Sequence, residues 1–146
     1  MEIFDYIVVG AGSAGCVLAE KLSASGRHSV LLIEAGPSDR RFWVRAPIGY
    51  GATFHDPVVN WRFQSEPEAG LLGRSIYMPR GKVLGGSSSI NALVYHRGQK
   101  DDYDDWRRAG NPGWDYQSLL RFFNQYEDIV HPGGIPKKMA GKLTIT

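Results

Sequence analysis

The sequence predicts an α/β fold. Three N-terminal segments carry the prediction: an apolar strand from Tyr6 to Val9, a helix from Ser13 to Ser23 and a second strand from Ser29 to Glu34. The middle segment repeats apolar residues at helical spacing, and Gly26 ends it. Strand, helix and strand in this order are typical of a Rossmann-like unit, in which a helix connects two parallel strands.

A glycine-rich turn lies between the first strand and the helix, with the sequence Gly10-Ala11-Gly12-Ser13-Ala14-Gly15 and the pattern GxGxxG. Gly10 permits a tight turn, Gly12 leaves room for phosphates, and Gly15 lets the helix pack on the strand. The helix N-terminus supplies unpaired N–H groups and a partial positive charge, which suit an anion. We therefore expect a pyrophosphate to bind at this turn.

Glu34 closes the second strand 19 positions after Gly15 (34 − 15). That separation is typical of a carboxylate that accepts hydrogen bonds from ribose hydroxyls. Because the same charge would repel a 2′-phosphate, the sequence favours FAD or NAD over NADP.

A second glycine-rich block, from Pro79 to Ala92, follows a segment from Pro37 to Gly73 in which prolines and glycines exclude long regular elements. We expect one short strand in that segment, near Trp61 to Ser65. In the second block, Gly85 and Gly86 would let the backbone lie flat against a ligand. Ser87 to Ser89 offer oxygens that would cap a helix, and Asn91 to Val94 offer backbone N–H groups. Such donors suit the edge of a flavin ring, and an ordinary NAD domain has no need of them.

The C-terminal third predicts an amphipathic helix from Trp114 to Glu127, followed by a Pro/Gly loop. The alternating residues Leu143 to Thr146 predict the start of a strand without a partner in this sequence.

The second block resembles the signature of the glucose-methanol-choline oxidoreductase family. Phe4 to Gly36 resembles that family's FAD fingerprint, Asn60 to Pro67 resembles its following strand, and Asp101 to Trp106 with Gly110 to Trp114 resembles its next segment. The resemblance implies a partial, incomplete Rossmann-like FAD-binding domain over residues 1–140, with 141–146 as the first strand leading into a substrate domain. It also implies an FAD site that comprises Gly10, Gly12, Ser13, Ala14, Gly15, Glu34, Ala35, Trp61, Val83, Gly85, Gly86, Asn91, Ala92, Leu93 and Val94. For Trp61 and Val83, core packing is an equal alternative.

Some members of this family attach the flavin to a histidine just before the asparagine, and Ile90 stands at that position. Isoleucine cannot form this bond, so the resemblance implies non-covalent FAD.

The resemblance implies oxidation of a CH–OH group, with hydride passing from an alcohol to flavin N5 and a histidine acting as base. His28, His55 and His131 lie in turn or loop sequences, and His96 follows the second block. We expect none of them to be catalytic, because relatives carry this histidine in a distant C-terminal segment. We expect that segment to lie downstream or to be present as a separate complementary chain of the same protein. Fatty-acid photodecarboxylation, hydroxynitrile cleavage and a non-catalytic nucleotide-binding module remain alternatives.

Composition limits the possible partners. The formal net charge of +2 and the lack of a long basic run argue against nucleic acid. The single cysteine, Cys16, cannot form an internal disulfide, which favours a reducing compartment such as the cytoplasm. No integral membrane segment and no metal-ligand spacing is visible. The ligands that the family resemblance implies are FAD and a small-molecule alcohol.

Overall fold

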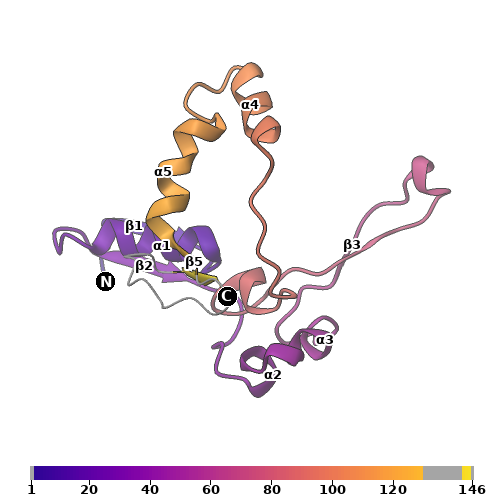
Figure 1. The fold of residues 1–146 in the computed structure, drawn as a ribbon. Helices are drawn as coiled ribbons and strands as arrows, with labels where there is room; N and C mark the ends of the chain where they lie inside the picture. Colours follow the sequence, from indigo (N-terminus) through magenta and orange to yellow (C-terminus); the bar gives the residue numbers. More distant parts are fainter. Residues whose placement is uncertain (1, 130–142, 146) are drawn as a thin grey trace. The chain divides into compact units, whose positions relative to one another are not determined.

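The computed structural model describes residues 2–129 and 143–145 and divides into two compact units, Met1–Val94 and Tyr95–Thr146 (Figure 1). Each unit has its own strands and helices. The domain boundary expected after residue 140 falls outside the described residues, so it stays a prediction. No helix in the described part of the chain is both long and apolar enough to cross a membrane.

The first unit begins with the strand–helix–strand arrangement that the sequence predicts. Strand β1 (Tyr6–Val9), helix α1 (Ser13–Ser23) and strand β2 (Val30–Ile33) follow one another along the chain. The two strands pair in parallel, with Tyr6 opposite Val30 and Val9 opposite Ile33. This pairing requires a crossover connection, which α1 provides. The α/β class is therefore confirmed, with β2 one residue shorter at each end than expected.

The β1–β2 sheet leaves apolar surface uncovered. Val9 is 82% exposed and Ile7 is 61% exposed, although parallel strands are normally buried on both faces. Among the described residues, these strands pair only with each other. Within the described part of the chain, this sheet therefore has two strands.

Short elements fill the remainder of the first unit, as the prolines and glycines predict. They are α2 (Phe42–Arg45), the 3₁₀ helix η1 (Pro47–Gly49), α3 (Tyr50–Thr53), β3 (Phe63–Gln64), η2 (Ala69–Leu71), β4 (Tyr77–Met78) and η3 (Gly86–Ser89). Strand β3 confirms the expected short strand, and its antiparallel partner β4 was not predicted. Figure 1 shows these two strands in an extended arm, while Val59, Val83 and Ile90 form a small core with Val44 packed against it.

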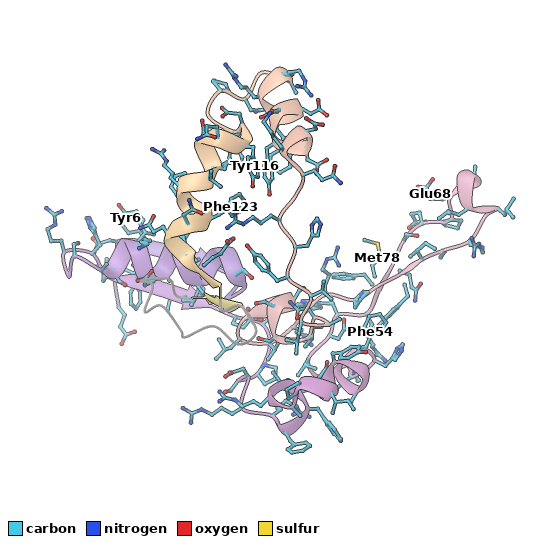
Figure 2. The ribbon with its side chains drawn as sticks, viewed as in Figure 1. Tyr6, Phe54, Glu68, Met78, Tyr116 and Phe123 are labelled. Atoms are coloured by element: carbon cyan, nitrogen blue, oxygen red, sulfur yellow. The ribbon has the colours of Figure 1, made fainter. Side chains whose placement is uncertain are left out.

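The second unit contains α4 (Lys100–Arg108) and α5 (Tyr116–Tyr126). Helix α5 confirms the expected amphipathic helix with slightly different ends. Helix α4 was not predicted; its N-terminus has a reciprocal capping box between Gln99 and Asp102. Tyr103 of α4 packs against Tyr116 and Phe123, with ring centroids 5.8 and 5.9 Å apart. Figure 2 shows Tyr116 and Phe123 on α5.

The C-terminal strand has a partner, contrary to the prediction from the sequence. Strand β6 (Leu143–Ile145) pairs in parallel with β5 (Glu127–Ile129), which follows α5 directly. The prediction failed because Glu127 was assigned to the helix. In the structure its backbone is extended (φ −101°, ψ 129°), so the chain leaves α5 as a strand.

Candidate dinucleotide and flavin site

The first glycine loop has the geometry that its sequence predicts. Gly10 has φ +94°, a left-handed conformation that favours glycine, and its N–H donates to the carbonyl of Ile33 at 2.7 Å. A Cβ on Gly15 would lie 1.9 Å from the carbonyl oxygen of Gly10. Glycine at position 15 is therefore required for α1 to pack against the turn.

The N-terminus of α1 is open to a ligand. Gly12 is the N-cap residue, no side chain caps the helix, and the first turn contains no acidic residue. The N–H groups of Ser13, Ala14 and Gly15 have no acceptor within the helix, because helical hydrogen bonding begins at Cys16, which donates to Gly12. A Cβ on Gly12 would meet nothing within 4 Å. Open space in front of free donors fits a pyrophosphate.

Glu34 lies beside this loop, and both of its carboxylate oxygens accept backbone hydrogen bonds. Oε2 accepts from the N–H of Ala11 at 2.8 Å, and Oε1 accepts from the N–H of Gly36 at 2.9 Å. Ala35 lies between Glu34 and Gly36 in the turn after β2. The predicted contact of Glu34 with ribose hydroxyls stays a prediction, and the carboxylate has further lone pairs for it.

Hydrogen bonds link the second glycine block directly to the first loop. The N–H of Gly85 donates to the carbonyl of Ala11 at 2.7 Å, and the hydroxyls of Ser13 and Ser88 lie 3.2 Å apart. A Cβ on Gly86 would lie 2.8 Å from the Cα of Gly12. The missing Cβ of Gly86 therefore makes room for the first loop. Contact of Gly85 and Gly86 with a ligand stays a prediction.

The serines of the second block do not cap a helix, and that expectation is wrong. Residues 86–89 form the short 3₁₀ helix η3, and the hydroxyls bond within their own loop. Ser88 donates to the carbonyl of Gly85 at 2.6 Å, and Ser89 donates to the carbonyl of Leu84 at 2.7 Å. Ser87 accepts from the N–H of Gly81 at 3.0 Å. Since no helix follows directly, the hydroxyls stabilise the loop.

Residues missed by the sequence analysis contribute to the packing of the second block, both within the block and against the turn after β2. A Cβ on Gly36 would lie 1.8 Å from the carbonyl oxygen of Lys82, and a Cβ on Gly81 would lie 2.2 Å from the carbonyl of Gly86. Ala11, which links both blocks, has no exposed surface. Their only sequence signal is their position inside or beside a glycine motif.

Val83 and Ile90 belong to the core of the first unit. Val83 has no exposed surface and Ile90 is 6% exposed, and both pack in one cluster with Val59. Trp61, in contrast, is 46% exposed; it stacks on Phe63, and the ammonium of Lys82 lies 4.9 Å from its ring centroid. The structure thus gives Val83 a packing role, and the flavin contacts of Val83 and Trp61 stay predictions.

A largely apolar cavity of about 460 Å³ opens beside the second block. Its lining comprises Tyr50, Gly51, Phe54, Pro79, Arg80, Ser87, Ile90, Asn91 and Ala92. Of the predicted site residues, Asn91 and Ala92 line this cavity. Asn91 accepts from the N–H of Leu93, which has φ +60°, and Leu93 and Val94 are strongly exposed. These exposed residues leave the segment accessible to a ligand.

Two of the described histidines, His28 and His55, pack against aromatic rings. His28 packs edge-on against Tyr6, and His55 stacks on Tyr77 with ring centroids 5.4 Å apart. His96 is exposed and belongs to the second unit, and His131 lies outside the described residues. Within the described part of the chain, no cluster of His, Cys, Asp and Glu could hold a metal ion.

Known proteins with similar sequences or structures belong to one oxidoreductase family. The sequence profile of a family described as GMC oxidoreductase matches residues 4–146. An oxygen-dependent choline dehydrogenase from Photobacterium profundum is 52% identical over 88% of this chain and 22% of its own length. An alcohol dehydrogenase [acceptor] from Pseudomonas putida is 47% identical over 86% of this chain and 23% of its own.

A crystal structure of pyridoxine 4-oxidase from Mesorbium loti superposes with a TM-score of 0.85 and 34% identity, over 97% of this chain and 28% of that one. The chain thus spans about a quarter of the length of these relatives and corresponds to the N-terminal part of such structures.

Proposed function

This chain belongs to the GMC oxidoreductase family, an FAD-dependent family, and from that premise we propose that it supplies the FAD site of an enzyme that oxidises an alcohol CH–OH group. Its similarity to choline and alcohol dehydrogenases supports an alcohol as the substrate class.

The observation that carries the proposal is the contact between two glycine loops that surround the open N-terminus of α1. Gly12 and the N–H groups of residues 13–15 would hold the pyrophosphate, and Glu34 would accept from the ribose. Residues 91–94, accessible beside the apolar cavity, would border the isoalloxazine ring. When bound, FAD would supply the hydride acceptor for alcohol oxidation.

We further propose that the FAD is held without a covalent bond at position 90. Ile90 offers only hydrocarbon there and is buried against Val59 and Val83. The substrate would meet the apolar cavity side of the second block, where Tyr50, Ser87 and Asn91 are the uncharged polar side chains in the lining.

The proton acceptor for the alcohol hydroxyl would come from a complementary C-terminal segment. Two observations support this part of the proposal. The described histidines pack against aromatic rings or belong to the second unit, and the chain matches only about a quarter of the length of its relatives. The uncovered apolar strands β1 and β2 would pack against this segment.

Absorbance spectroscopy of the purified, intact protein tests the cofactor directly. We expect flavin bands that survive dialysis and then pass into the supernatant after acid precipitation. Flavin that stays in the precipitate would contradict the non-covalent attachment, and a colourless protein that does not bind added FAD would contradict the proposed function.

A further inference from the structure

Taking the proposed FAD site as its basis, we propose that Glu34 is a positioning residue for both glycine loops and acts through Ala11. The role expected from its sequence position is limited to ribose hydroxyls. Its observed hydrogen bonds extend that role to the shape of the phosphate-binding turn.

Ala11 is held from two sides. Its N–H donates to Oε2 of Glu34 at 2.8 Å, and its carbonyl accepts from the N–H of Gly85 at 2.7 Å. The Sγ of Cys16 lies 3.3 Å from the same carbonyl. Because Ala11 has no exposed surface, water cannot replace these partners.

The position of Ala11 affects the ligand site through the next residue, Gly12. Its Cα lies directly against Gly86, where an added Cβ would approach to 2.8 Å. A shift of Ala11 therefore moves Gly12 against the second loop on one side and changes the pyrophosphate space on the other. Holding Ala11 in place pre-organises the site, which reduces the ordering cost of binding.

Glu34 suits this task because two N–H donors, one from the first glycine loop and one from the turn after β2, reach the same side chain. Oε2 accepts from the N–H of Ala11, and Oε1 accepts from the N–H of Gly36 at 2.9 Å. A glutamine would have one carbonyl oxygen for the two donors and would place its NH₂ group against the other N–H. The substitution Glu34→Gln therefore removes one backbone contact in either amide orientation.

The test separates positioning from ribose binding by changing the ligand as well as the protein. FAD and its 2′,3′-dideoxyadenosine analogue are titrated into the intact apoprotein and into Glu34→Gln. We expect Glu34→Gln to weaken binding of both ligands by about tenfold or more, the loss typical of a hydrogen bond to a charged group. Equal affinity of both proteins for the dideoxy analogue would overturn the inference, because it would limit Glu34 to the ribose.

A matched control is Asp5→Asn, which makes the same acid-to-amide change on the same strand pair. Asp5 accepts from the N–H and the hydroxyl of Ser29 at 2.7 and 2.8 Å, beside the first residue of β1. Affinity for both ligands should stay within about twofold of the parent. A loss equal to that of Glu34→Gln would overturn the inference, since it would reflect general damage to the sheet.

Amide hydrogen exchange on the unsubstituted apoprotein gives a second measurement that does not depend on a variant folding. We expect the N–H groups of Ala11 and Gly36 to be protected without ligand, because Glu34 accepts both. Exchange at the rate of an open turn would overturn the inference. Failure of the parent to bind FAD would instead contradict the proposed function, and the exchange result would still decide the role of Glu34.

Discussion

The substitution Gly12→Ala should weaken FAD binding and leave the fold intact. Gly12 has φ −79° and ψ −172°, which alanine adopts readily, and an added Cβ would meet no protein atom within 4 Å. The unfolded chain loses some freedom, so stability should stay equal or rise by about 0.4–1 kcal/mol. The methyl group would occupy the space assigned to the pyrophosphate, with a cost of about 1–3 kcal/mol, or roughly 5- to 150-fold in affinity.

Gly15→Ala is the matched contrast on the same loop. Its Cβ would lie 1.9 Å from the carbonyl oxygen of Gly10, which is backbone and cannot move without displacing β1 or α1. This variant should lose stability, by at least the upper part of the 1–3 kcal/mol range of overpacking. Thermal unfolding of the apoproteins and FAD titration measure the two effects separately. Tight FAD binding by Gly12→Ala would refute the placement of the pyrophosphate, and unfolding of that variant would refute the loop geometry.

Three further predictions test the remainder of the structure. Gly86→Ala should lower the melting temperature and weaken FAD binding, because its Cβ would lie 2.8 Å from Gly12 Cα and position 86 has φ +61°. Arg97→Met should lower the free energy of unfolding by about 3–5 kcal/mol, measured by chemical denaturation, because the buried Glu127 carboxylate loses its guanidinium partner. Adding Glu127→Leu to this variant should restore most of the lost stability. Hydrogen bonds from the backbone and hydroxyl of Ser118 lower the pKa of the N-cap residue Asp115 below 3.8. The stabilisation of α5 by this carboxylate is therefore present at neutral pH and disappears as the pH falls through the lowered pKa. Circular dichroism should show that Asp115→Asn removes this acid dependence of the helix.

Local signals predict the nucleotide half of the fold well. The limits of β1 and α1 agree with the expectation because strand pattern, glycine turn and helical periodicity are adjacent in the sequence. Helix α4 was missed because its residues are almost all charged, and so apolar periodicity gives no signal. Its capping box and the i,i+4 pair of Lys100 with Asp104 stabilise it instead.

The sequence by itself determined that two glycine motifs of a GMC oxidoreductase are present, because glycine spacing and helix start are local properties of the chain. Only the tertiary structure decided what Glu34, Gly85 and Gly86 do for the first loop. Gly86 and Gly12 are far apart in the sequence, and neither motif predicts that the two backbones are in contact. Such contacts depend on how β1, α1 and the second block pack together. In a close-packed interior, the position of each residue depends on all of its neighbours, which are distant in the sequence.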